Sequence, residues 1–254
     1  MIRPYILAET NWEHLQNEKF ELAVLPWGAT EAHNYHLPYG TDNYQAEAMV
    51  GQAAKKAWEL GKKVIVLPTI PFGVNTGQSD IYLDMNLNPS TQLAILKDLV
   101  TVLNRQGIYK LLLFNGHGGN NFKPLVRELG LLFPKMFISF CFFPPMLDKS
   151  DYFTEKGDHA DEMETSLMLH LHPELVLPKD KWGSGGEKKF KIKAFNEGWV
   201  WAERQWSKVS EDTGIGNPAH ATAEKGERFF NDVCKQVTEL FCSLCDADLN
   251  DLYQ

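Results

Sequence analysis

The sequence has neither an excess of positive charge nor a long uncharged apolar run. Its 254 residues include 25 Lys and Arg against 33 Asp and Glu, which gives a formal net charge of -8. Because no basic field would attract a phosphate backbone, this balance disfavours nucleic-acid binding. The first ten residues lack the apolar core and cleavage pattern of a signal peptide, and no apolar stretch is long enough to cross a membrane. We therefore expect a soluble, cytoplasmic protein without nucleic-acid or membrane partners.

Cysteine is also scarce, and its pattern does not favour a zinc or redox site. The four cysteines are Cys141, Cys234, Cys242 and Cys245. The last two form a C-x-x-C pair, but this pair lacks the second Cys/His pair of a zinc knuckle. Around them, apolar residues recur every three or four positions, at Phe230, Cys234, Val237 and Phe241. We therefore interpret three of the cysteines as small apolar residues of a buried helix face.

What the sequence does contain is an alternation of short apolar runs and longer amphipathic stretches. The apolar runs predict strands at residues 22 to 26, 63 to 68, 109 to 114 and 136 to 143. The amphipathic stretches predict helices at residues 42 to 60, 90 to 106, 121 to 132, 161 to 171 and from 223 onward. Because this alternation favours a mainly parallel sheet between helices, we expect an α/β fold. Its form would be a three-layer α/β/α sandwich, in a single domain over residues 1 to 254.

Two segments lack a clear period. Residues 71 to 88 are rich in glycine, asparagine and proline and predict a long loop, which in a compact domain is often functional. Residues 179 to 217 are mixed and rich in tryptophan, and we expect a strand or hairpin near residues 197 to 206. Trp199 and Trp201 could stack there on a planar substrate, although packing on an edge strand is the commoner role of such residues.

A polar loop follows the first predicted strand and carries potential metal ligands. Glu31 and His33 are two residues apart, so in an extended chain their side chains project to the same side. Asp42 joins them from the head of the following helix. Two carboxylates and an imidazole suit zinc, manganese or another divalent ion. The alternative is a polar surface loop with incidental charges.

A glycine-rich turn, NGHGGN at residues 115 to 120, follows the third predicted strand. Its glycines permit unusual backbone angles and close approach of other groups to His117. The turn could instead expose an incidental histidine, or bind an anion with its backbone amides. However, sites on parallel sheets form beyond the carboxyl ends of the strands, where this turn and the first loop both lie. We therefore favour His117 as a further metal ligand.

Four blocks of the sequence together resemble the creatininase (creatinine amidohydrolase) family. They are PWGATEAHNYHLPYGTD at 26 to 42, NGHGGN at 115 to 120, HADEMETSLML at 159 to 169 and GNPAHATAEKG at 216 to 226. The blocks span most of the chain in the order of the family, and the glycine-rich turn is that of one of its branches. The resemblance implies an α/β/α fold and two divalent metal ions per chain, zinc or manganese or both. It also implies a homo-oligomer, commonly a hexamer.

The same resemblance assigns roles to the first four ligands. Glu31 and His117 would bind one ion, and His33 would bind the other. Asp42 would bridge the two ions, which requires both oxygens of one carboxylate. Ions bridged in this way lower the pKa of a bound water toward neutrality and so supply a hydroxide nucleophile.

The second ion needs a further ligand. Creatininase has a glutamate in the turn after the histidine, where this chain has Gly119. We expect Glu164 to replace it, with Asp161 as a competing ligand, although both acids could simply favour the positive start of their helix. By resemblance, His159 would carry a proton from the attacking water to the leaving nitrogen. Five residues separate His159 from Glu164, about 140° on an ideal helix, so the two converge only if His159 precedes the helix.

These expectations combine into a function. We expect a binuclear amidohydrolase that cleaves the C–N bond of a small amide, cyclic or open, or of a formamide by metal-activated hydroxide. His36, Asn120 and Trp199 would contact the substrate or support the ligands.

Two alternatives stay open. One is a metallophosphoesterase-like hydrolase, which typically carries D-x-H where this chain has E-x-H; the other is a non-catalytic protein that binds a small molecule.

Overall fold

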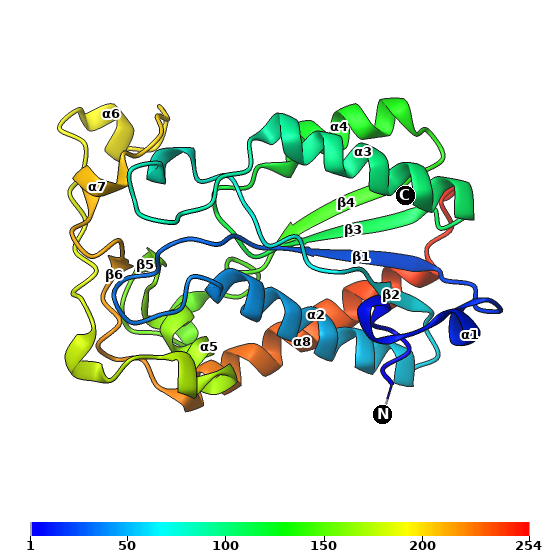
Figure 1. Cartoon of the computed structure of the whole chain (residues 1–254), viewed down its shortest axis with the longest axis horizontal. Coiled ribbons are helices and arrows are strands. Elements are labelled where there is room, and N and C mark those ends of the chain that lie inside the picture. Colours follow the sequence, from blue (N-terminus) through cyan, green and yellow to red (C-terminus); the bar gives the residue numbers. More distant parts are fainter. Residues whose placement is uncertain (1, 254) are drawn as a thin grey trace.

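A four-stranded sheet of parallel strands forms the middle layer of the molecule (Figure 1). In this computed structural model, which describes residues 2 to 253, the strand order is β2-β1-β3-β4. The strands are β1 (Leu22–Trp27), β2 (Val64–Val66), β3 (Lys110–Asn115) and β4 (Phe137–Phe142). All residues of β1 and β2 are buried, as expected for strands that are covered on both faces. The predicted parallel sheet is therefore confirmed.

Helices cover both faces of this sheet. Below it in Figure 1 lie α2 (Thr41–Glu59), α5 (Glu162–Leu171) and α8 (Ala223–Asp246), and above it lie α3 (Pro89–Gln106) and α4 (Phe122–Leu132). Alternate residues of β1 serve the two layers, because Leu22 and Val24 pack with the lower helices whereas Ala23 and Leu25 pack with the upper ones. This three-layer α/β/α sandwich confirms the predicted fold class.

The long helices α3 and α8 follow from local sequence features. α3 begins at Pro89, whose fixed backbone suits a first turn, and ends before Gly107, which has a left-handed φ of 78°. Cys234 and Cys245 are buried within α8 and Cys242 is partly buried, so these cysteines are apolar helix residues as predicted. Among the helices of residues 2 to 253, none is long and apolar enough to cross a membrane.

Short elements gather beyond the carboxyl ends of the strands, at the left of Figure 1. They include the antiparallel pair β5 (Gly157–His159) and β6 (Ile215–Gly216), and the helices α6 (Lys193–Asn196) and α7 (Trp206–Val209). The helix α1 (Trp12–Leu15) lies at the opposite end of the molecule. Single turns of 3-10 helix are η1 (Leu7–Glu9), η2 (Thr76–Gln78), η3 (Lys149–Asp151), η4 (Pro173–Leu175) and η5 (Lys179–Lys181).

The strand or hairpin expected near residues 197 to 206 is wrong. These residues, all of them described, form an irregular segment that ends at the start of α7. Trp199 and Trp201 are 73% and 84% exposed, so these two rings form no buried face. Without such a face, a strand has nothing to pack against.

Candidate metal centre

Six titratable side chains converge at the carboxyl ends of β1 and β3. They come from the loop after β1, the first turn of α2, the turn after β3, the end of β5 and the first turn of α5, and they are Glu31, His33, Asp42, His117, His159 and Glu164. All six are buried, none more than 6% exposed. Charged groups are rarely buried in this number unless they pair or bind a metal.

Glu31, Asp42 and His117 form a first group of potential metal ligands, called the first ligand group below. Nδ1 of His117 lies 2.7 Å from Oε1 of Glu31 and 3.0 Å from Oδ2 of Asp42. Its Nε2 donates to the carbonyl oxygen of Val74 at 3.0 Å, so Nδ1 is the ring atom that faces the two carboxylates. Within residues 2 to 253, neither of these carboxylate oxygens has a hydrogen-bond partner. Because unpartnered buried oxygens are costly, three donor atoms aimed at one point fit a divalent cation.

His33, Asp42 and Glu164 form a second ligand group. Nε2 of His33 lies 3.0 Å from Oδ1 of Asp42 and 3.9 Å from Oε2 of Glu164. The other ring nitrogen of His33, Nδ1, donates to the main-chain carbonyl of Glu31 at 3.1 Å. Asp42 thus faces the first group with one oxygen and the second group with the other. This is the arrangement that a carboxylate bridging two ions requires.

Asp161, the competing candidate, points away from both groups. Its Oδ1 accepts the backbone N–H of Glu164 at 3.0 Å and so caps α5, and its Oδ2 accepts from Lys149 at 2.8 Å. Glu164 instead reaches the cluster, where it also accepts the N–H of Ala160. Asp42 does not cap α2, because Gly40 holds the N-cap position and the carboxylate of Asp42 turns toward the histidines.

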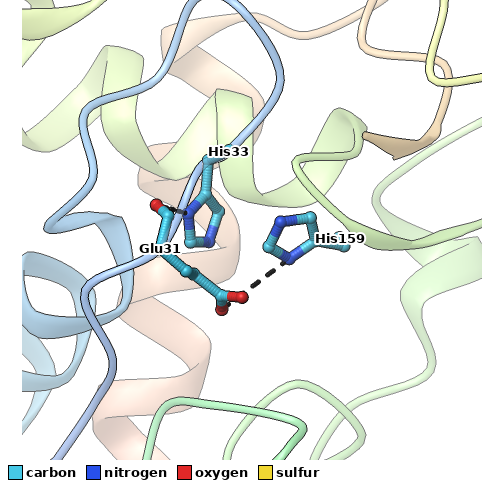
Figure 2. Close-up of side chains that lie close together, drawn as sticks. All are labelled: Glu31, His33 and His159. Carbon is cyan, nitrogen blue, oxygen red and sulfur yellow. Dashed lines mark hydrogen bonds and ion pairs between the residues drawn. The ribbon is translucent and has the colours of Figure 1, made fainter. Parts of the chain in front are cut away.

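His159 lies beside Glu31 and His33, with its ring facing the carboxylate of Glu31 (Figure 2). It ends β5, and Ala160, with a positive φ of 49°, turns the chain so that α5 begins after it. Its Nε2 donates to the carbonyl of Ala32 at 2.8 Å, and its Nδ1 faces Oε1 of Glu31 at 3.9 Å. Burial, together with the charge of His33, lowers the pKa of His159. The ring is therefore neutral near pH 7, with a free lone pair on Nδ1.

The electrostatics of the cluster depend on protons that a cation would replace. Burial would raise the pKa of Glu31, but the charge of His117 holds it well below its usual value. Burial would lower the pKa of His33, but neighbouring Asp42 raises it to about 10, and Glu31 likewise raises the pKa of His117. Burial raises the pKa of Glu164 to about 8 against the charge of His33. Protonated histidines thus balance carboxylates that a bound divalent ion would balance instead.

Two cavities reach the cluster. The larger, of about 750 Å³, is lined by Glu31, His117 and His159 together with parts of residues 74 to 78 and 201 to 206. The smaller, of about 210 Å³, is lined by ligands of both groups, including Asp42 and Glu164. Pockets that bind small molecules commonly have volumes of roughly 300–1,000 Å³. The larger cavity therefore has the size of a substrate site.

Comparison with known proteins decides the family. Residues 8–241 match the model of the family Creatininase, described as creatinine amidohydrolase. The chain belongs to the creatininase family. A mycofactocin precursor peptide peptidase of Mycobacterium tuberculosis is 30% identical to this creatininase-family chain over 218 residues, which cover 82% of the chain and 79% of that protein. The chain is therefore an amidohydrolase of this family, and the resemblance of its four sequence blocks is confirmed.

Solved structures agree with this family assignment. A Bacteroides fragilis protein named as a candidate creatinine amidohydrolase superposes with a TM-score of 0.92 at 38% identity, with both chains covered completely. A creatininase named with manganese superposes with a TM-score of 0.77 at 19% identity, over 96% of this chain and all of the other. The second likeness establishes the creatininase fold alone.

Three further residues predicted for the site of this creatininase-family chain take different positions. Asn120 lines the larger cavity and joins the turn to the loop of residues 71 to 88, because its Oδ1 accepts the N–H of Val74 at 3.1 Å. His36 turns away: its Nε2 lies 2.9 Å from the hydroxyl of Thr165, and its ring stacks on Trp182. Burial lowers the pKa of His36 to about 4. Its contacts indicate a structural role.

Trp199, by contrast, lies outside both cavities that the described residues form, and its indole N–H donates to Glu197 at 3.1 Å. Two other tryptophans, Trp201 and Trp206, line the larger cavity instead. The ring of Trp206 packs edge-on against His159, with 4.7 Å between the ring centroids. Sequence reasoning singled out Trp201 but missed Trp206, because only the irregular path of this segment brings it to the site.

Gln78 was also missed by sequence reasoning. Its Nε2 donates to Oε2 of Glu31 from η2, within the loop of residues 71 to 88. A glutamine in a segment without periodicity carries no sequence signal of such a contact. Only the length and composition of the loop indicated that the loop could contribute to a functional site.

Proposed function

We propose that this chain is a binuclear metal-dependent amidohydrolase that cleaves the C–N bond of a small amide or formamide. The observation that carries the proposal is that the two oxygens of Asp42 face different ligand groups, 3.0 Å from His117 on one side and 3.0 Å from His33 on the other. A carboxylate that served a single ion, or none, would not need two such sets of partners.

In this proposal, Glu31, Asp42 and His117 hold one ion, and His33, Asp42 and Glu164 hold the other. Imidazole nitrogens with carboxylate oxygens suit zinc and manganese. When bound, two such ions polarise an amide carbonyl and lower the pKa of a water molecule. The protein fixes the orientation of the three histidines, because one ring nitrogen of each donates a hydrogen bond to a main-chain carbonyl.

His159 is the proton carrier of the proposed reaction. Its Nδ1 accepts a proton from the attacking water, and the same atom then gives this proton to the nitrogen that leaves when the C–N bond breaks. The hydrogen bond from Nε2 to the carbonyl of Ala32 keeps the ring in the tautomer that leaves Nδ1 free. The edge contact with Trp206 limits rotation of the ring and shields it from solvent on that side.

The larger cavity is the proposed substrate site. Trp201 and Trp206 offer apolar faces, while Asp158 and Arg204, joined by an ion pair of 3.1 Å, add polar groups to its wall. A substrate screen should therefore include cyclic amides, formamides and short peptides, the last because a relative is named as a peptidase. We also propose a homo-oligomer, with the family's common hexamer as the first candidate, which light scattering on the purified protein would check.

Metal analysis tests the proposal. We expect about two equivalents of zinc or manganese per chain. Asp42→Ala should lose both ions. Its activity should fall by more than roughly 100-fold, which is the largest loss expected when a residue that only supports a ligand is removed. The matched control, Glu47→Ala, removes an exposed carboxylate from the same helix and should keep both ions. A metal-free wild-type protein would favour the binding protein, and hydrolysis of phosphate esters but not amides would favour the phosphoesterase.

A further inference from the structure

The loop of residues 71 to 88 surrounds the first ligand group from outside. The carbonyl of Val74 accepts from His117 at 3.0 Å. The carboxylate of Asp84 accepts the backbone N–H of Ala32, the residue between Glu31 and His33, at 2.7 Å. Through these contacts the loop fixes both the ring of one ligand and the main chain that carries two others. The loop is therefore part of the construction of the metal centre.

Gln78 makes the most direct of these contacts. It is 3% exposed, it ends η2, and its Nε2 donates to Oε2 of Glu31. The other oxygen of Glu31, Oε1, faces His117 at 2.7 Å and His159 at 3.9 Å. The two oxygens of this carboxylate therefore have separate surroundings: a neutral amide donor on one, and the ligand group on the other.

We propose that Gln78 is a positioning residue that makes Glu31 a ligand through Oε1 alone. This inference rests on the proposed function. A carboxylate with both oxygens free can rotate or take an ion between its two oxygens. A hydrogen-bond donor on Oε2 prevents rotation of the carboxylate and binding of the ion between its two oxygens. It also leaves more room around the ion on the side of the larger cavity, whose wall includes Gln78 and Glu31.

The chemistry of the glutamine side chain suits this role. A lysine or arginine at this position would place a positive charge beside the cation, and an acid would repel Glu31. An apolar side chain would leave a buried carboxylate oxygen without a donor. A neutral amide instead satisfies Oε2 and leaves the full negative charge of Glu31 for the ion.

The test compares wild-type protein with Gln78→Met, which keeps the length and bulk of the side chain and removes the donor. Both proteins are loaded with cobalt(II), and the visible absorption, the dissociation constant of each ion, kcat and KM are measured. We expect Q78M to bind one of the two ions about 10- to 100-fold more weakly, with a changed cobalt spectrum. In kinetics, kcat should fall by more than KM changes.

Two further variants make the result decisive. Asn86→Ala removes an exposed side chain that accepts the N–H of Asn75 within the same loop, without contact to a ligand, and should leave the cobalt spectrum as in wild type. If Q78M does not fold, Gln78→Asn replaces it, since the shorter side chain keeps the amide but cannot reach Oε2.

The outcomes separate this inference from the proposed function. An unchanged spectrum and unchanged affinities in a folded Gln78 variant would overturn the positioning role, even if the wild-type protein hydrolyses amides. The same spectral change in N86A would also overturn it, because loosening of the loop would then be the cause. A wild-type protein that binds cobalt but cleaves no amide would refute the proposed function while the role of Gln78 is still decided by the spectrum. A protein that binds no metal would overturn both.

Discussion

The two ligand groups that share Asp42 differ in what supports them. The first, with Glu31 and His117, is held from outside by the loop of residues 71 to 88 and opens to the larger cavity. In the second, Glu164 comes from the first turn of α5 and contributes to the wall of the smaller cavity. The larger cavity is lined by Glu31 and His117, but among the described residues that line it neither Asp42 nor Glu164 occurs. Glu31 and His117 therefore face the proposed substrate site directly, whereas Glu164 does not.

The carboxylates of the two ligand groups also differ in protonation. At pH 7 without an ion, Glu31 is ionised, because the charge of His117 outweighs the effect of burial on its pKa. Glu164 keeps a proton, because burial raises its pKa to about 8. Without an ion, Glu31 is therefore closer than Glu164 to the deprotonated form in which a carboxylate binds a cation.

Among the variants considered, Glu164→Gln is expected to separate the two ligand groups most strongly. The variant should lose the ion of the second group, and turnover with it, while the first ion stays bound, because Glu31, Asp42 and His117 are untouched. Metal content and turnover on the best amide from the screen are the measurements. Asp161→Asn is the matched control in the same helical turn. Asparagine preserves the cap of α5, so this variant should keep both ions. Loss of an ion from D161N but not from E164Q would reverse the assignment.

His159→Ala is expected to separate chemistry from metal binding. With the proton carrier removed, kcat should fall by about 10²–10⁴-fold, a typical contribution of general acid–base catalysis. Both ions should remain, since neither of the two groups to which we assign an ion includes His159. Metal analysis of the same sample used for kinetics makes the comparison. Full turnover in a metal-loaded H159A would show that another group carries the proton.

The pH dependence of metal affinity sharpens the comparison further. The pKa of His33 is raised to about 10 and that of Glu164 to about 8, so both hold protons at pH 7 that the second ion must displace. In the first group the pKa of His117 is raised, whereas that of Glu31 is lowered. Affinity should therefore fall as pH falls from 8 to 6, by about tenfold per unit for each proton displaced, and more steeply for the second ion. Calorimetry in buffers of different ionisation enthalpy measures the protons released. Equal slopes for the two ions would contradict the assignment.

Much of the fold could be predicted from the sequence, because its causes are local. The strands β1 and β3 are short apolar runs, and α3 lies between a proline and a glycine that mark its ends. Glu31, His33, Asp42 and His117 directly follow predicted strands or begin a predicted helix, and the parallel topology brings such positions together. The resemblance to the creatininase family then supplied their separate roles.

The remaining features depend on contacts that no local pattern records. Whether Glu164 or Asp161 reaches the cluster is decided by where α5 begins, and this depends on the positive φ of Ala160. The irregular path of residues 197 to 206 was mistaken for a strand because the segment is rich in tryptophan. Gln78 contacts a residue 47 positions away in the sequence, across a loop without periodicity.

The consecutive residues Glu31, Ala32 and His33 each contact a different part of the candidate metal centre. The side chain of Glu31 belongs to the first ligand group and that of His33 to the second, while the carbonyl of the middle residue holds His159. Three consecutive residues thus set the spacing between the two proposed ion positions and the proposed proton carrier. A single-residue insertion here would shift one side chain to the opposite side of the chain. Glu31 and His33 would then no longer project to the same side, although every proposed ligand would still be present in the sequence.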